Sequence, residues 1–542
     1  MTKPWLATYS EDIPHEINAD AYPSAVAVFD EAVATFADKP AFECFGKTMT
    51  YAEIDRAARS VAAWLQKTGV KRGDRIAVMC PNIFAFPIVM LGVMRAGAAQ
   101  VNVNPLYTPR ELSHQLNDAG AETILIYSGS TPVLAEVLDQ TPIKNIVTIG
   151  LGDGAGLPIQ SPPVDERLSD TVALADVLTE GAGLEFTPVE LNGEDIIFFQ
   201  YTGGTTGLSK GAVLTHRNIV ANGEQFKAFM PEVHEVGTEI VVLALPLYHI
   251  FGLMVMIAFV SSGAKQILIP NPRDMDSFVG AIKDSKFSVI PGVNTMFQGL
   301  MMHPDFDKID LSGYKVAIGG GAAVIKATSE KWHALTGHQI KEGYGLSETS
   351  PVLCLNPMNV THFTESCGLA VPSTDIKLLD DDGNEVAEGE AGEICAAGPQ
   401  IMRGYWNNDD ANLKAFTPDG YFRTGDVGMF IEGGFLKIVD RKKDMILVSG
   451  FNVYPNEVEA VVTACEGIAE CACIGVPDEK SGEAVRIYAV RMAGSDVTDK
   501  DVIAHCRTEL AGYKVPRQVI FLDALPKSNV GKILRRELRE QA

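Results

Sequence analysis

The chain has 542 residues, which is too long for one hydrophobic core, so two or more domains are expected. A hydrophobic content of 46% with mixed charge is typical of a folded protein rather than a disordered one. The net charge of -24 argues against nucleic acid as a partner and against electrostatic attachment to an anionic membrane. Nine scattered cysteines fit no disulfide framework and indicate a reducing, cytoplasmic setting.

Two stretches bear on targeting and on membranes. Residues 1–18 are acidic and polar, so no signal peptide is predicted there. The apolar stretch 240–264 is long enough to span a membrane, but Pro246, His249 and Gly252 interrupt it. We expect a buried strand, a loop and a buried helix in its place.

The N-terminal part of the chain alternates helix and strand signals. Capping boxes at Thr50–Glu53 and Thr108–Glu111 begin two helices, and an apolar run at 123–127 predicts one of the strands. This alternation predicts a parallel sheet covered by helices. A glycine-rich run at 150–155 matches the spacing of the dinucleotide-binding fingerprint. It is not interpreted as such a site, because the proline-rich segment after it cannot form the required helix.

The pattern changes in the second half of the chain. Between about 376 and 438, short strands are separated by glycine and aspartate, which predicts a small β-subdomain. The charged run 440–444 then begins a new unit whose alternation predicts a compact α+β domain. We therefore divide the chain into domains 1–439 and 440–542.

The stretch 201–212, Tyr-Thr-Gly-Gly-Thr-Thr-Gly-Leu-Ser-Lys-Gly-Ala, has the composition of a polyphosphate-binding loop. Glycines let backbone N–H groups approach an anion, and hydroxyls and one lysine add donors and positive charge. The spacing is not that of a Walker loop, and an apolar strand at 212–214 follows in place of a helix. The candidate phosphate ligands are Thr202, Gly203, Gly204, Thr205, Thr206, Gly207 and Lys210.

Two candidate stretches lie in the middle of the chain. His249 stands among bulky apolar residues at 245–252, where a core histidine without a catalytic role is the competing interpretation. Gly321, Ala322 and Ala323 follow a predicted strand, and such small residues can admit a flat ring against the backbone.

The remaining candidates suit the other parts of a nucleotide. Tyr344 and Gly345 offer an aromatic face for stacking, and Glu348 offers a carboxylate of the kind that Mg²⁺ takes together with phosphate oxygens. Asp426 offers an acceptor for a ribose diol. Lys532 lies on a glycine-containing turn before a predicted helix. Taken singly, each is explained as well by an ordinary turn or a solvated charge; together they indicate a nucleotide site divided between two domains.

In this order and spacing the motifs resemble those of the adenylate-forming enzymes, and among them the bacterial long-chain fatty acid–CoA ligases. The most specific pieces are the stretches 201–207, 343–348, 439–455 and 526–535, and the resemblance covers nearly the whole chain. It implies an α/β fold with a large N-terminal adenylation domain of two helix-covered sheets plus a small β-subdomain. A small mobile α+β C-terminal domain is implied as well.

The resemblance implies two half-reactions that use ATP, Mg²⁺ and coenzyme A. The carboxylate of a fatty acid attacks the α-phosphate to give acyl-AMP and pyrophosphate, and the thiol of coenzyme A then displaces AMP to give a long-chain acyl-CoA. Because a carboxylate and a triphosphate repel each other, positioning and charge neutralisation are the main catalytic tasks. The partners implied are small molecules, and the resemblance leaves the oligomeric state open.

The resemblance also implies roles for the charged candidate residues. Lys532 bridges the fatty acid carboxylate and the α-phosphate, Lys210 holds the outer phosphates with the loop hydroxyls, and Glu348 binds Mg²⁺. Thr205, one of those hydroxyls, is counted with Lys532 and His249 among the catalytic residues.

The other candidates are assigned to the nucleoside. Tyr344 and the backbone of 321–323 sandwich adenine, and Asp426 and Arg441 hold the ribose. His249 lies where the acyl and pantetheine paths meet.

A hinge is implied at Asp440, about which the small domain turns between the half-reactions. This turn brings Gly450 to the site for the second step. Lys532, which belongs to the small domain, is not expected to serve that step.

Other classes remain alternatives. A medium-chain or aryl acid–CoA ligase of the same superfamily would share these motifs. A peptide-synthetase adenylation module should place an acidic residue near 245–252, and none is present there. A luciferase-like oxygenase would typically end in a peroxisomal tripeptide, and a nucleotide-sensing protein would lack the catalytic lysine. The apolar substrate leaves a weak peripheral association with the inner face of the membrane open despite the acidic charge.

Overall fold

The computed structural model describes residues 3–202, 209–449, 451–478, 480–528 and 532–541. The chain forms two compact units. The large unit consists of Trp5–Asp375 and Ala397–Gly420, and the small unit of Met1–Pro4, Ile376–Ala396 and Tyr421–Ala542. The domain boundary between 439 and 440 stays a prediction.

The first sheet of the large unit has eight strands in the order β19-β9-β8-β4-β3-β5-β6-β7. They are β3 (Arg75–Met79), β4 (Ala99–Asn102), β5 (Thr123–Tyr127), β6 (Asn145–Ile149), β7 (Thr171–Ala173), β8 (Ile196–Thr202), β9 (Lys210–Thr215) and β19 (Gly404–Tyr405). Strands β3 to β8 pair in parallel, which confirms the predicted sheet, while β9 and β19 add an antiparallel edge.

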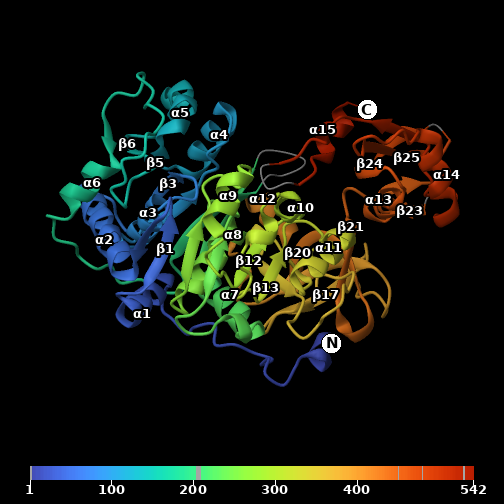
Figure 1. Ribbon diagram of the computed structural model, residues 1–542, viewed down its shortest axis with the longest axis horizontal. Helices are drawn as coiled ribbons and strands as arrows, with labels where there is room; N and C mark the ends of the chain where they lie inside the picture. The colour runs from blue at the N-terminus through green and yellow to red at the C-terminus, as the bar shows by residue number, and fades with distance from the viewer. Residues whose placement is uncertain (1–2, 203–208, 450, 479, 529–531, 542) are drawn as a thin grey trace. The chain divides into compact units, whose positions relative to one another are not determined.

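Helices cover both faces of this sheet (Figure 1). On one face lie α4 (Pro109–Ala119) and α5 (Thr131–Val137), whose buried leucines pack against β3, β4 and β5. On the other face lie α2 (Tyr51–Lys67), α3 (Ala85–Arg95) and α6 (Leu174–Gly181), which pack against one another.

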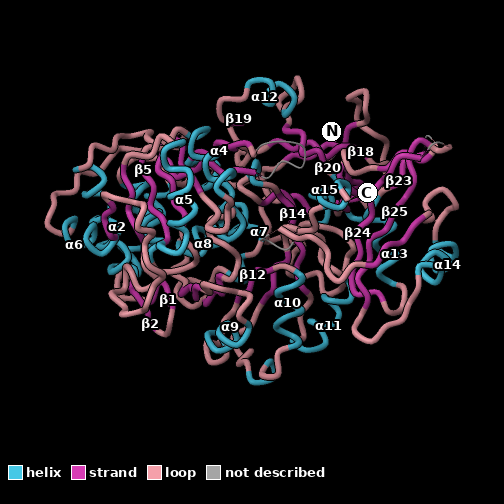
Figure 2. Tube along the Cα trace, turned by 90° about the horizontal axis from the view of Figure 1, so that it is seen from above, coloured by secondary structure: helices cyan, strands magenta, loops and turns pink. Residues whose placement is uncertain are grey.

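The second sheet of the large unit has nine strands in the order β16-β15-β14-β13-β12-β10-β11-β1-β2. They are β1 (Pro40–Cys44), β2 (Lys47–Thr50), β10 (Ile240–Leu243), β11 (Lys265–Leu268), β12 (Val289–Gly292), β13 (Val316–Gly319), β14 (Ile340–Gly345), β15 (Val352–Leu355) and β16 (Leu369–Ala370). One face packs against α9 (Met275–Ile282), α10 (Asn294–Met302) and α11 (Lys326–Thr336), which Figure 2 shows together beside β12. Three further helices, α1 (Ala25–Phe36), α7 (His216–Phe229) and α8 (Ile250–Val260), contact one another.

Local sequence explains where several of these helices begin. Thr50 and Thr108 form the predicted capping boxes, each accepting a hydrogen bond from the N–H of the glutamate three residues later. The stretch 240–264 folds as predicted, with β10, a loop and α8 in succession. Helix α8 is apolar on every side and almost wholly buried. No helix in the described part of the chain combines the length and apolarity that crossing a membrane requires.

The small unit contains two sheets. One is the four-stranded sheet β17 (Asp375–Leu379), β18 (Gly392–Ala397), β20 (Phe422–Phe430) and β21 (Leu436–Arg441), which confirms the predicted β-subdomain. The other contains β22 (Ile446–Val448), β23 (Phe451–Val453), β24 (Ile468–Asp478), β25 (Gly482–Arg491) and β26 (Gln518–Phe521). With α13 (Pro455–Ala464), α14 (Asp499–Glu509) and α15 (Arg535–Glu540) it forms the expected α+β fold.

The predicted extent of the β-subdomain needs one correction. Residues 397–420 lie in the large unit, because β19 pairs with β9 and α12 (Asp409–Ala415) packs against β19. Short antiparallel strands look alike in sequence, so the change of partner sheet was not visible there.

Two helix glycines give opposite predictions for substitution by alanine. An added Cβ at Gly92 in α3 would lie 2.6 Å from the Cβ of Val61 in α2, whereas one at Gly223 in α7 would meet no neighbouring atom within 4 Å. We expect Gly92→Ala to lower the free energy of unfolding by about 1–3 kcal/mol through overpacking. Gly223→Ala should raise it by about 0.5–1 kcal/mol through helix propensity. Thermal unfolding midpoints that shift in the same direction would contradict the close contact of α2 with α3.

Candidate active site

The phosphate loop is carried by two antiparallel strands, as the sequence predicted. Thr202 at the end of β8 pairs with Lys210 at the start of β9, so the two strands bring both ends of the loop together. Gly203, Gly204, Thr205, Thr206 and Gly207 lie outside the described residues. The strand pair therefore fixes the base of the loop, and no helix follows it directly.

Helix α4 braces both ends of the loop. His114 donates from Nε2 to the carbonyl oxygen of Ser209 at 2.8 Å, which assigns its ring proton to Nε2. The hydroxyl of Tyr201 donates to Asp118 at 2.6 Å. Gly211 lies directly against the Tyr201 ring, where an added Cβ would be 3.0 Å from Cζ. Sequence reasoning missed His114 and Asp118, because they lie far from the loop in the chain.

Glu348 lies in a short 3-10 helix, Ser347–Thr349, that follows β14. Its side chain is buried, and Oε1 accepts a hydrogen bond from the hydroxyl of Tyr405 at 2.8 Å. The Lys210 ammonium lies 4.7 Å from the centroid of the same ring. Burial, together with the charge of Glu348, raises the pKa of the Tyr405 phenol. The structure thus links two predicted site residues through a tyrosine that the sequence did not single out.

Glu348 fits a magnesium ion that is shared with a substrate. The described residues contain no group of three or more acidic, histidine or cysteine side chains that could hold a metal on its own. Mg²⁺ in nucleotide sites takes only one or two carboxylates and fills its remaining positions with phosphate oxygens and water. One buried carboxylate, linked to Lys210 through Tyr405, matches that requirement.

The segment proposed to face adenine is shaped by glycines. At Gly320 an added Cβ would lie 2.8 Å from the ring of Phe251, and Gly321 has a φ of +78°, which only glycine adopts easily. Ala322 and Ala323 follow it and are exposed.

Strand β14 carries the aromatic candidate. Tyr344 is buried in this strand. The next residue, Gly345, approaches the backbone so closely that a Cβ would fall 1.7 Å from the carbonyl oxygen of Pro351. Only glycine fits there, which explains the Tyr-Gly pair.

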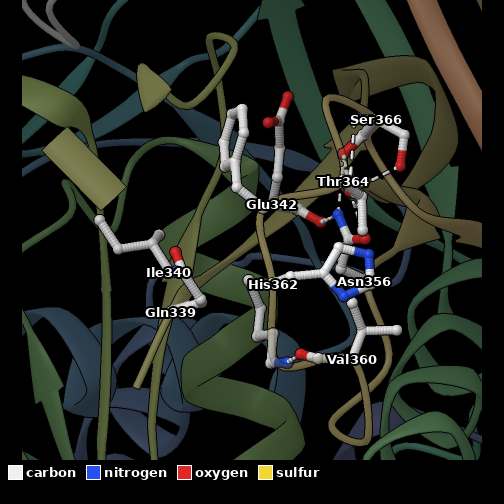
Figure 3. Close-up of a pocket in the computed structure, with 10 residues that line it drawn as sticks. Gln339, Ile340, Glu342, Asn356, Val360, His362, Thr364 and Ser366 are labelled. Carbon is white, nitrogen blue, oxygen red and sulfur yellow. Dashed lines mark hydrogen bonds between the residues drawn. The ribbon is translucent and has the colours of Figure 1, made fainter. Parts of the chain in front are cut away.

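A pocket beside β14 contains a carboxyl group that the sequence analysis did not identify (Figure 3). Its lining includes Glu342 and Asn356, whose side-chain amide donates to the carbonyl of Ser366. Burial raises the pKa of Glu342 to about 8, against the opposing effect of a hydrogen bond from the N–H of Val324. That bond attaches the turn after Ala323 to β14.

His249 occupies the N-cap position of α8. Its Nδ1 accepts a hydrogen bond from the N–H of Phe251 at 3.3 Å, and the ring is half-buried. Two buried amides hold the preceding loop. Asn82 donates to the carbonyls of Leu243 and Leu245, and Gln200 donates to that of Tyr248. The His249 ring is therefore held at the N-terminus of α8. Neither interpretation from the sequence, a core histidine or a catalytic one, predicted this N-cap position.

The small unit gathers three cationic side chains around one predicted site residue, Lys532. Lys532 is flanked by Arg441, Lys443 and Arg535, and Asp426 is the carboxylate that acts on it most strongly. Burial and these three cations lower the pKa of Lys532 to about 8, although Asp426 opposes the shift. Such a cluster is stabilised by an anion.

Asp426 and Arg441 lie opposite each other on β20 and β21, and Arg441 Nε is 3.2 Å from an oxygen of Asp426. The structure therefore brings together Lys532, Asp426 and Arg441, which the sequence analysis had assigned to one nucleotide. Their predicted roles toward a ligand remain predictions.

Asp440 lies fully buried at the end of β21. Its two oxygens accept hydrogen bonds from the N–H groups of Arg441 and Asn456, both at 2.7 Å. Burial raises the pKa of Asp440, against the opposing charge of Arg535. These bonds tie the strand to the start of α13 at the predicted hinge, and Gly450 lies outside the described residues.

Helix-covered sheets, a glycine-rich loop between two strands and a cluster of cations are features of nucleotide-activating α/β enzymes. The chain belongs to the AMP-binding enzyme family, whose model matches residues 29–406. The model of the AMP-binding enzyme C-terminal domain matches residues 457–532.

Curated relatives and solved structures are similar over the whole chain. The long-chain-fatty-acid–CoA ligase of Salmonella typhimurium is 46% identical over 100% of this chain and 99% of its own. The enzyme of the same name from Bacillus subtilis is 37% identical over 99% and 98%. The crystal structure of ATP-bound MatB from Rhodopseudomonas palustris has a TM-score of 0.83 and 29% identity, covering 96% of this chain and 99% of that one.

The Glu342 carboxyl predicts a pH dependence of stability. Its pKa is higher in the folded chain than in the unfolded one, so the folded state binds the extra proton and loses stability as the pH rises from about 4.5 to about 8. Glu342→Gln keeps an acceptor for Val324 but carries no charge. We expect the variant to gain stability over the wild type across this range, by on the order of a few kcal/mol at pH 8.

Chemical denaturation at a series of pH values measures this difference. The exposed Glu330→Gln on α11 serves as the control and should follow the wild type. Parallel stability curves for Glu342→Gln and the wild type would contradict this prediction. They would show that Glu342 is ionised in the folded protein over the same pH range as in the unfolded one.

Proposed function

We propose that the protein is an AMP-forming long-chain fatty acid–CoA ligase. The observation that carries the proposal is the crowding of Lys532 by other cations, which an ATP phosphate and a carboxylate would relieve together. Full-length similarity to relatives with this named activity supports the choice of acid.

In the first step the fatty acid carboxylate attacks the α-phosphorus of ATP and pyrophosphate leaves with the electrons of the broken P–O bond. Lys532 neutralises the charge that the carboxylate and α-phosphate bring together. Lys210 and the loop hydroxyls hold the departing phosphates. Mg²⁺, bound through Glu348, would supply further neutralisation of the phosphate charge. Asp426 and Arg441 bind the ribose, and Tyr344 stacks against adenine.

In the second step the sulfur of coenzyme A attacks the acyl carbonyl, and AMP leaves as the C–O bond breaks. His249 lies beside the reacting carbonyl in this proposal. Because its Nδ1 accepts the hydrogen bond from Phe251, the proton of the neutral ring is on Nε2. A turn of the small domain about Asp440 separates the two steps and brings Gly450 to the thiol.

An apolar wall supports an apolar acid as the substrate. Helix α8 is buried and carries no charged side chain, and Met296 and Phe297 of α10 are buried against the second sheet. Such a wall suits an aliphatic tail, while a medium-chain or aryl acid is the alternative. The proposal includes a cytoplasmic location with weak peripheral contact to the membrane that supplies the acid.

Release of pyrophosphate over a series of acids from acetate to oleate, with ATP, Mg²⁺ and coenzyme A, tests the proposed function. We expect kcat/KM to rise with chain length and to be highest for long-chain acids. A maximum at a medium-chain or an aromatic acid would select the alternative ligase.

The role of Lys532 predicts a separation of the two steps. Lys532→Ala should lower adenylate formation by a factor of about 10² or more, because one charge that acts only in the transition state is lost. Thioester formation from synthetic acyl-AMP and coenzyme A should change little. Equal losses in both half-reactions would contradict the assignment, and Lys527→Ala, which removes a nearby lysine paired with Glu470, is the matched control.

A further inference from the structure

Tyr405 contacts two residues of the proposed phosphate site at once. Its hydroxyl donates to Glu348 Oε1 at 2.8 Å, and its ring faces the Lys210 ammonium at 4.7 Å from the centroid. Lys210 begins β9 of the first sheet, whereas Glu348 lies in the short 3-10 helix after β14 of the second sheet, so the two residues belong to different elements. A side chain that joins a carboxylate and an ammonium in this way can set the position of both.

The backbone around Tyr405 is attached to the elements that carry both residues. Tyr405 pairs with Ala212 of β9, two residues after Lys210. The N–H of Met402 donates to the carbonyl oxygen of Glu348 at 2.8 Å. Main-chain hydrogen bonds thus connect the segment around Tyr405 to β9 and to the 3-10 helix that carries Glu348. The side chain of Tyr405 adds its contacts with Lys210 and Glu348 to these bonds.

Asn412 completes the support. Its side-chain oxygen accepts from the N–H of Tyr405 at 2.6 Å, and its amide donates to the Tyr405 carbonyl at 2.9 Å. The residue before, Gly404, has a φ of +150°, and a Cβ there would lie 2.9 Å from Asn412. Both polar groups of the Tyr405 backbone are satisfied, and the direction of its side chain is fixed.

We propose that Tyr405 is a positioning residue that holds the metal-binding carboxylate and the phosphate-binding lysine ready for a magnesium–polyphosphate pair. A hydroxyl donor on Oε1 restricts rotation of the Glu348 carboxylate, and the ring face restricts the long side chain of Lys210. Because the two side chains are already ordered in the free protein, they lose less conformational entropy when the ligand binds. This inference rests on the proposed function, in which Glu348 binds Mg²⁺ and Lys210 binds phosphate.

Two substitutions separate the contributions of the hydroxyl and the ring. Tyr405→Phe keeps the ring under Lys210 and removes the bond to Glu348. Tyr405→Leu removes both. Tyr51→Phe is the matched control, because it loses a buried tyrosine hydroxyl bonded at 2.8 Å to the carbonyl of Ala264.

Binding of ATP measured by calorimetry over a range of Mg²⁺ concentrations, without acid or coenzyme A, gives a readout independent of turnover. For Tyr405→Phe we expect the Mg²⁺ concentration at half-maximal ATP binding to rise about tenfold, as for loss of a hydrogen bond to a charged group. Tyr405→Leu should bind the complex more weakly still. Adenosine, which has no phosphate, should bind all variants as it binds the wild type.

The outcomes distinguish this inference from the proposed function. A Tyr405→Phe protein with wild-type Mg²⁺ dependence overturns the positioning role alone. Equal weakening of adenosine and ATP also overturns it, because the residue would then act on the fold in general. A wild-type protein that binds no magnesium–ATP overturns the proposed function and this inference together.

Discussion

The small unit holds like charges close together, and the proposed chemistry depends on that constraint. Lys532 lies among Arg441, Lys443 and Arg535, and their repulsion acts with burial against its charged form. In the proposed reaction, a bound polyanion removes the repulsion among these cations. The free energy gained in this way offsets part of the repulsion between the substrate carboxylate and the triphosphate. Arg535 is itself held by Glu459 at 2.8 Å, which keeps the cluster from spreading.

In the large unit, the two charged candidates Lys210 and Glu348 are supported by a neutral side chain. Tyr405 joins Lys210 to Glu348, and α4 fixes the strands on which the loop is built through His114. Positions are set by strand pairing and close glycine contacts rather than by a helix dipole. The two ends of the proposed phosphate loop are therefore held by strand pairing and by α4.

Much of the fold could be predicted from local patterns. The capping boxes, the strand after the proposed phosphate loop and the succession of β10, a loop and α8 follow from spacing and residue type. The features that were not predicted depend on contacts and strand pairs between residues that are distant in the sequence. Tyr405, His114 and Glu342 act through partners far away in the chain, and the segment 397–420 changes sheets at β19. The motif around Lys532 and the ribose candidate Arg441 were visible in the sequence, but the approach of Lys443 and Arg535 to Lys532 was not.

If the site around Lys532 is built for an anion, the lysine itself must titrate accordingly in the free and nucleotide-bound protein. Competitive acetylation over a range of pH, with the peptide that contains Lys532 quantified by mass spectrometry, gives its midpoint. We expect a midpoint of about 8 in the free protein, well below the ordinary 10.5, and a rise of at least about one pH unit when magnesium–ATP is bound. An ordinary midpoint in the free protein, or one that nucleotide leaves unchanged, would contradict it.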